Sequence, residues 1–221
     1  MMALPKLTTP EYNLTVPSTQ EEIKFRAFLV KEQKVLMIAQ ESNDEKMVAN
    51  ALSSLVSTCT YGKVDADKNP MFDIEYIFLQ IRAKSVGAKV TLNVYCPDDN
   101  VTTTEIEVDL ESIQVQTNVE HSDTIKLTDD IKVVLNPPRL SDVAGLDLMD
   151  SEFEKMTQLV KRCISSVETN DETINRIDMT SEEIDEFINS FSGKQLEDVV
   201  NFFETMPKFV ILLRLPTLSR K

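Results

Sequence analysis

The chain has 221 residues, 42% of them hydrophobic and 27% charged, a composition ordinary for a globular protein with a real core. Its 37 acidic and 23 basic residues leave a net charge of −14, which argues against general binding to nucleic-acid phosphates and favours basic protein partners. Three widely spaced cysteines, Cys59, Cys96 and Cys163, argue against a disulfide framework, and no apolar run approaches the about 20 residues that a membrane span needs.

The first 20 residues predict an extended N-terminal arm. They contain three prolines and several threonines, and one strand fits near Tyr12–Val16. The segment lacks the continuous apolar core of a signal peptide, so we expect the protein to be made and kept in a reducing cytoplasm, or packed into something assembled there.

Helical periodicity follows the arm. Apolar residues recur at steps of three and four, which predicts helices near 31–41 and 44–58, joined at Ser42-Asn43. A polar loop then leads into FDIEYIFLQIRAKSVG, residues 72–87. Two adjacent apolar stripes predict that this third helix is largely buried, and Gly87 is a natural stop.

The middle of the chain changes to a two-residue period. Val90, Leu92, Val94 and Cys96 alternate with other residues, which is typical of a strand. Strands are predicted at 90–96, 101–109, 112–119, 124–127 and 131–135. We expect them to form one antiparallel meander that ends at Asn136-Pro137-Pro138.

The C-terminal third is predicted to be helical, at 151–167, 181–190 and 194–205. The fold class is therefore predicted as α+β, with N-terminal helices, a central antiparallel meander and a C-terminal helical subdomain. The expected parts are the arm (1–20), an α+β body (21–140), the helical subdomain (141–207) and a basic, apolar tail (208–221).

The residues that carry chemistry form no recognisable active site. A serine or cysteine nucleophile normally needs a base, and the single histidine, His121, reads best as a solvated turn residue. Cys96-Pro97 resembles the turn of a zinc ribbon but lacks companion cysteines. Asp65, Asp67 and Asn69 match the first oxygen ligands of a calcium loop, but its sixth position is Pro70 where glycine is needed and its twelfth is Tyr76 where glutamate is needed. We expect no catalytic residue, no metal and no cofactor.

Three stretches resemble the baseplate hub subunit family of T-even-type, contractile-tailed bacteriophages. They are FRAFLVKEQKVLM (25–37), FDIEYIFLQIRAKSVG (72–87) and TSEEIDEFINSFSGKQLEDVVNFFETMP (180–207), and the resemblance runs from about residue 3 to 207. It implies a non-enzymatic virion or assembly protein of the tail baseplate, assembled in the host cytoplasm. The implied partners are hub, tape-measure or wedge subunits in an oligomeric assembly.

The tail after Pro207 departs from the family's expected continuation. Residues 208–221 contain four cations and no acid, around the apolar run Phe209–Leu213. Three interpretations stay open: a terminal strand packed on the body, an end that comes from another reading frame, or a docking tail for an acidic, grooved partner.

Aromatic residues are the candidate partner contacts, since such side chains often dominate binding energy. The candidates expected to be exposed are Tyr12, Phe25, Phe28, Phe202 and Phe203, and the tail adds Phe209 and Arg214. For the rings before the tail, ordinary core packing is the competing interpretation. The competing function is a tail assembly chaperone for tape-measure or hub proteins, absent from the mature virion. A tail-associated lysozyme would need a framed pair of carboxylates, which no motif supplies.

Overall fold

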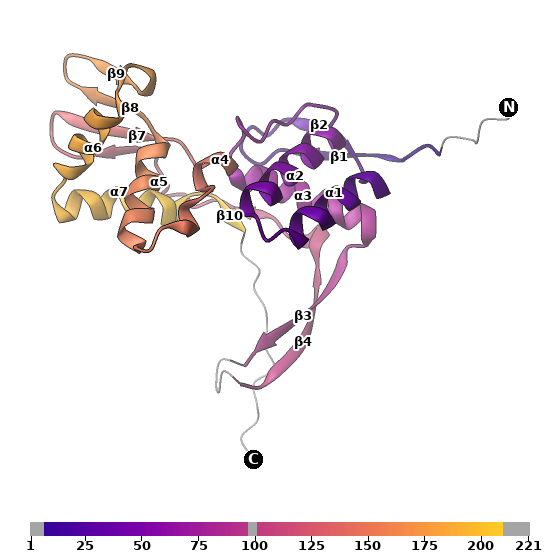
Figure 1. Ribbon diagram of the computed structural model, residues 1–221. Helices are drawn as coiled ribbons and strands as arrows, with labels where there is room; N and C mark the ends of the chain where they lie inside the picture. Colours follow the sequence, from indigo (N-terminus) through magenta and orange to yellow (C-terminus); the bar gives the residue numbers. More distant parts are fainter. Residues whose placement is uncertain (1–6, 97–100, 210–221) are drawn as a thin grey trace.

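The computed structural model describes residues 7–96 and 101–209. Its first half contains β1 (Glu11–Thr15), β2 (Glu22–Arg26), α1 (Val30–Glu41), α2 (Glu45–Cys59), α3 (Met71–Val86), β3 (Lys89–Tyr95), β4 (Thr103–Asp109), the 3₁₀ turn η1 (Leu110–Ser112) and β5 (Val115–Gln116). Its second half contains β6 (Thr124–Lys126), β7 (Ile131–Leu135), α4 (Leu140–Val143), η2 (Leu146–Leu148), α5 (Glu152–Cys163), β8 (Ile164–Thr169), β9 (Thr173–Asn175), η3 (Arg176–Asp178), α6 (Ser181–Asn189), α7 (Gly193–Thr205) and β10 (Lys208–Phe209). Figure 1 shows two bodies beside each other and a hairpin arm, β3–β4, that projects from the first body.

The first body is built around α3. Three isoleucines on one face of this helix, Ile74, Ile77 and Ile81, are fully buried against α2 and the β1–β2 hairpin. Leu14 of β1 and Phe25 of β2 complete the same core. The helix ends at Gly87, whose φ of 108° is a conformation that a residue with a Cβ rarely adopts.

A buried carboxylate ties the N-terminal segment to α3. Asp73 is fully buried and accepts hydrogen bonds from the Ser18 backbone N–H (3.0 Å) and from the Ser18 hydroxyl. Burial raises the pKa of Asp73, although the bonds from Ser18 act in the opposite direction. The loop after β1 is therefore pinned to the first turn of α3.

A buried ion pair organises the start of α1. Arg26 donates a hydrogen bond to Glu32 (3.1 Å), and the second oxygen of Glu32 accepts the Leu29 backbone N–H (2.6 Å). Leu29 has no side-chain oxygen, so Glu32 supplies the acceptor at this helix terminus. Desolvation would raise the Glu32 pKa, but the Arg26 hydrogen bond, the Leu29 N–H and the Arg26 charge together lower it.

A second, smaller core anchors the base of the hairpin arm. Ala83 of α3 packs with Val108, Leu110 and Ile113, which lie at the end of β4 and just after it. A salt bridge from Lys84 to Glu111 (2.9 Å) fastens the same junction. The arm is therefore held at one end, and its strands continue outward from the body (Figure 1).

The second body is a four-stranded antiparallel sheet in the order β6-β7-β8-β9, covered by α5, α6 and α7. Val133 and Leu135 of β7 meet Val160 of α5, Ile184 of α6 and Phe202 of α7 in its core. β10 then returns to the first body, where it pairs with β5. The chain thus crosses between the two bodies twice, between β5 and β6 and again after α7.

The α+β class and the principal helices are confirmed. The helices predicted near 31–41, 44–58, 181–190 and 194–205 correspond to α1, α2, α6 and α7, and the helix of residues 72–87 is α3. α3 is largely buried, as its two apolar stripes predicted.

The predicted arrangement of the sheets is wrong. The strands form no single meander: β3–β4 is a separate hairpin, β5 pairs with β10, and β6 and β7 belong to the four-stranded sheet. The helix predicted at 151–167 is too long: α5 ends at Cys163, and residues 164–167 are the first residues of β8. Ile164 and Val167 lie at a spacing that also suits a helix. Both are β-branched, which favours a strand, and both pair with residues of β7.

The boundaries of the predicted parts change accordingly. Residues 141–207 are no helical subdomain, because β8 and β9 share a sheet with β6 and β7, which lie before the boundary at residue 140. The arm 1–20 contains β1, whose Leu14 is in the core of the first body. The unpredicted strand β2 supplies the pairing partner.

We predict that Glu32→Ala lowers the free energy of unfolding by about 3 kcal/mol, because it leaves the Arg26 guanidinium buried without its carboxylate. Chemical denaturation measures the loss. Lys31→Ala is the control: Lys31 is exposed and also contacts Glu32 (3.4 Å), so its removal costs under about 1 kcal/mol. Equal effects of the two substitutions would contradict the assignment.

The raised pKa of Asp73 predicts a pH dependence with a definite sign. A carboxyl whose pKa is higher in the folded state contributes stability that is present below its ordinary pKa and lost as pH rises through the folded pKa. Relative to Asp73→Asn, the wild type should therefore lose stability between about pH 4 and the raised pKa. Urea denaturation across this range measures it, and parallel curves for the two proteins would refute it. Asp73→Ala, which removes both bonds to Ser18, should cost about 1–3 kcal/mol throughout.

Candidate interaction surfaces

A groove runs between α2 of the first body and the α4–η2–α5 segment of the second. It consists of two adjoining cavities of about 840 and 880 Å³, which share Glu45 and Ala49 on α2 with Leu140 and Ala144 opposite. The segment opposite α2 is held in place by Arg162 of α5, which donates to the carbonyl oxygens of Asp142 (2.6 Å) and Ala144 (3.0 Å). The groove therefore has walls from elements that are far apart in the sequence.

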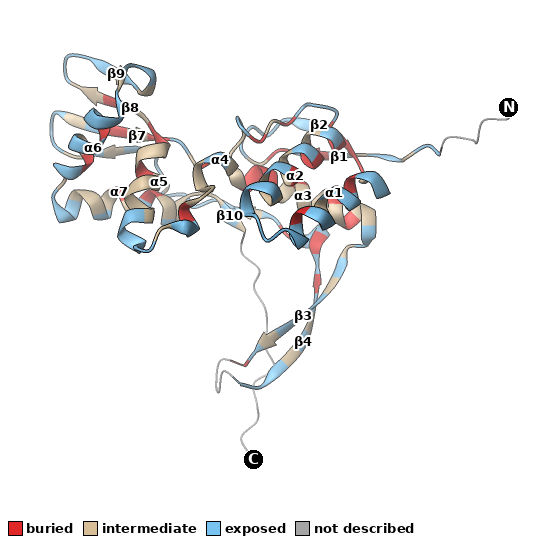
Figure 2. Cartoon of the chain, in the orientation of Figure 1, coloured by how far each residue is buried: buried red, intermediate tan, exposed pale blue. Residues whose placement is uncertain are grey.

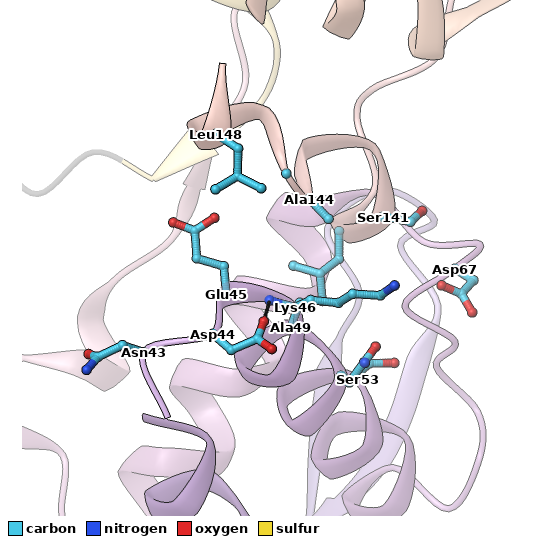
Figure 3. A pocket seen from close by; sticks show the side chains of 13 residues that line it. Asn43, Asp44, Glu45, Lys46, Ala49, Ser53, Asp67, Ser141, Ala144 and Leu148 are labelled. Atoms are coloured by element: carbon cyan, nitrogen blue, oxygen red, sulfur yellow. Dashed lines mark hydrogen bonds between the residues drawn. The ribbon is translucent and has the colours of Figure 1, made fainter. Parts of the chain in front are cut away.

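The second cavity is lined mainly by apolar side chains, and acidic residues line both cavities. Apolar side chains from both bodies line the second cavity: Val48, Leu52, Met71, Val143, Leu146, Met156 and Leu159. Figure 3 shows Glu45 extending from the start of α2 toward the segment that carries Leu148. The carboxylate of neighbouring Asp147 is the main cause of the raised pKa of Glu45, with smaller contributions from burial and from Asp44. An apolar floor with charges at its edge is the composition of a binding groove.

Helix α1 presents a second apolar surface. Its buried residues are Glu32 and Ala39, and the opposite face carries Val30, Met37 and Ile38, each more than half exposed. These three positions lie at i, i+7 and i+8, on one side of the helix. Within the described residues nothing covers them, and Figure 2 shows α1 largely in the colour of exposed residues.

The β3–β4 arm presents a third surface. Its apolar face carries Val90, Leu92 and Val94 of β3 opposite Val108, Ile106 and Thr104 of β4. Val90, Ile106 and Val108 belong to the core at the base of the arm, whereas Leu92, farther out, is 39% exposed. The arm's outer half therefore leaves apolar side chains in contact with solvent.

The aromatic residues predicted as partner contacts lie mainly in the two bodies. Phe25 and Phe202 are each 2% exposed, so the expectation that these rings are exposed is wrong. Phe25 packs near Tyr12, with ring centroids 5.5 Å apart, and Phe202 packs near Phe203 at 5.1 Å. Core packing, the competing interpretation, accounts for both buried rings.

The remaining candidates are partly buried or lie outside the described residues. Phe28 packs against the core of the first body and donates its backbone N–H to Ser85 Oγ (2.9 Å). Phe209 stacks on Tyr76 of α3, with centroids 6.4 Å apart. Arg214 lies outside the described residues, so its predicted contact stays a prediction, as do those of the partly buried rings.

His121 is more engaged than a solvated turn residue. Its Nδ1 lies 3.1 Å from Thr205 Oγ1, and its ring packs 5.0 Å from that of Phe202. Burial lowers its pKa, while Asp123 acts in the opposite direction. The residue therefore helps to fasten the β5–β6 connection to α7.

The three cysteines are free and buried. Burial raises the pKa of Cys59 to about 11 and that of Cys163 to about 12, so neither is a reactive thiolate at neutral pH. Within residues 7–96 and 101–209, no group of three or more His, Cys, Asp and Glu side chains is placed to hold a metal ion. No helix of the same part of the chain has the length and apolar character to cross a membrane.

Comparison with known families decides the relationship of the chain. The family described as T4 bacteriophage base plate protein matches residues 9–216, most of the sequence. The chain belongs to this base plate protein family. The match extends past Pro207, where we expected the resemblance to end, as far as residue 216. No curated protein matches the chain. No solved structure matches it either.

Membership in the base plate family assigns the exposed surfaces to a protein that works among other phage tail proteins. Sequence reasoning missed all three surfaces. The apolar residues of α1 were used only to predict a helix near 31–41, and residues 101–109 only to predict a strand. The groove left no signal at all, since its two walls are about 90 residues apart along the chain.

We predict that Asp147→Asn returns the pKa of Glu45 toward its ordinary value, because the neighbouring carboxylate is the main cause of its increase. A ¹³C NMR titration of the Glu45 carboxyl measures this. Glu186→Gln, a change at an exposed carboxylate of α6, is the control and should leave the Glu45 titration unchanged. An unaltered Glu45 pKa in Asp147→Asn would show that the two carboxylates do not face each other across the groove.

Proposed function

We propose that this base plate protein is a hub subunit that contributes to tail assembly through protein–protein contacts and remains in the finished particle. The match to the base plate family over residues 9–216 is the observation that carries the proposal. The exposed apolar face of α1 and the groove support it, because surfaces of this kind mark sites of protein association. Its partners would be neighbouring hub, tape-measure or wedge subunits.

The mechanism is burial of apolar surface against those neighbours. Val30, Met37 and Ile38 lie along one side of α1 over about 12 Å, with the polar residues Gln33 and Lys34 on the turn between them. That length suits one side of a helix or sheet in a partner. Such association needs neither a nucleophile nor a cofactor, which agrees with the burial of the cysteines and the packing of His121. We infer a non-enzymatic role.

Mass spectrometry of purified virions tests whether the protein remains in the particle. We expect its peptides in intact tails at a fixed ratio to other base plate subunits. Their absence from intact tails, together with their presence in assembly intermediates, would sink the proposal and support a transient assembly chaperone.

The α1 surface gives a matched pair of variants. Ile38→Glu should lower incorporation into tails about tenfold or more, because it places a charge within an apolar contact. Ile177→Glu, at a 91% exposed isoleucine of η3, should leave incorporation unchanged. Circular dichroism checks that both variants fold. Normal incorporation of Ile38→Glu would remove α1 from the assembly surface.

A further inference from the structure

The outer edge of β4 is free of backbone pairing within the described residues. β3 and β4 form a sheet of two strands, and β4 pairs with β3 alone. A two-stranded hairpin is at best marginally stable in water unless another element covers it. The arm consists of two seven-residue strands, so pairing with a third strand at this edge would stabilise it.

The backbone groups at this edge can be assigned from the register. The Leu110 N–H donates to Ala88 O (2.8 Å), and the Cys96 N–H donates to Thr102 O (2.7 Å), which marks hydrogen-bonded pairs at both ends of the ladder. Antiparallel pairs alternate between bonded and non-bonded positions. The pairs at the non-bonded positions include Glu105 and Glu107, whose N–H and C=O groups consequently point away from β3.

The side chains at the edge alternate in chemistry as well as direction. Glu105, Glu107 and Asp109 lie on one face of β4, and Ile106 and Val108 lie on the other. All three acids are exposed, and only Glu107 has an ion-pair partner among the described residues, Lys89 at 2.7 Å. The corresponding face of β3 carries Thr91, Asn93, Tyr95 and the single cation Lys89, without an acid, so the negative charge lies on β4.

We propose that the free edge of β4 binds an extended segment of a partner protein in which basic and apolar residues alternate. Added as a third strand, such a segment would bond to the outward N–H and C=O groups of Glu105 and Glu107. Its lysines or arginines would lie beside the acidic face of β4, and its apolar side chains would extend the face that carries Leu92 and Ile106. Opposite charges on adjacent strands stabilise the pairing, and the apolar side chains gain burial.

The inference goes beyond the proposed function, because it concerns the isolated chain and holds or fails whether or not the protein stays in the virion. The acidic residues on one face of β4 would repel a partner strand that is itself acidic. Because only the other face of β4 is apolar, a partner segment with apolar residues on both of its faces would not match it. About five to seven residues would match the length of β4.

Binding of a synthetic peptide, acetyl-TVKVKVKVT-amide, to the full chain tests the proposal. We expect saturable binding by isothermal titration calorimetry that weakens as salt is raised, and new hydrogen-exchange protection at the amides of Glu105 and Glu107. A peptide with glutamate in place of lysine should not bind. Absence of binding by the lysine peptide, or protection confined to Thr91 and Asn93, would overturn the assignment to β4.

Three variants separate the edge from the rest of the arm. Glu105→Lys/Glu107→Lys keeps the backbone groups and should weaken binding tenfold or more. Glu107→Pro removes one outward N–H, whereas Thr91→Pro removes the equivalent group from the β3 edge, and only the former should reduce binding. Hydrogen exchange within the β3–β4 ladder checks that each hairpin is intact. Equal binding by all variants would refute the proposal. A variant that ends at Phe209 gives one further test. If this variant binds the peptide and the full chain does not, the chain's own C-terminal residues occupy the edge, and the proposal of a partner protein is refuted.

Discussion

Helix α3 is the constraint on which the rest of the structure depends. Ile74, Ile77 and Ile81 bury one face in the core of the first body, and Ala83 buries another in the core at the base of the β3–β4 arm. Asp73 holds the loop after β1, and the ring of Tyr76 stacks on Phe209 of the last described strand. A helix buried on two faces cannot rotate or slide without breaking both cores at once, so it fixes the N-terminal hairpin, the arm and β10 together.

The surfaces available for partners follow from what α3 leaves uncovered. α1 uses Glu32 and Ala39 to attach to the body, which places larger apolar side chains on its solvent face. The arm is anchored through Val108 and Leu110, so its outer half extends away from both bodies (Figure 1). In a protein of the base plate family such surfaces have a natural use, since neighbouring subunits can bury them.

Features that depend on residues close together in the sequence were predicted correctly, whereas features that depend on residues far apart were not. The side chain of Asp44 caps α2 by accepting the N–H groups of Lys46 and Met47, and α3 ends at Gly87. Both signals are local; the stop at Gly87 was predicted, and the helix near 44–58 was predicted from apolar spacing. Residues 164–167 misled the prediction, because apolar spacing that continues a helix also suits a strand once β7 lies alongside. Phe25 and Phe202 look like contact residues in isolation, but burial depends on neighbours that are distant in sequence.

The sequence by itself determined the α+β class, the principal helices, the absence of a recognisable catalytic motif and the resemblance to a base plate family. These depend on side-chain periodicity, helix termini and residue inventory, which are properties of short segments. Only the tertiary structure decided how the strands of the described residues divide among four sheets, which side of α1 faces solvent and that α2 and α4 line one groove. Strand pairing and groove formation join segments tens of residues apart. The free energy of those contacts depends on which segments meet, which local patterns do not encode.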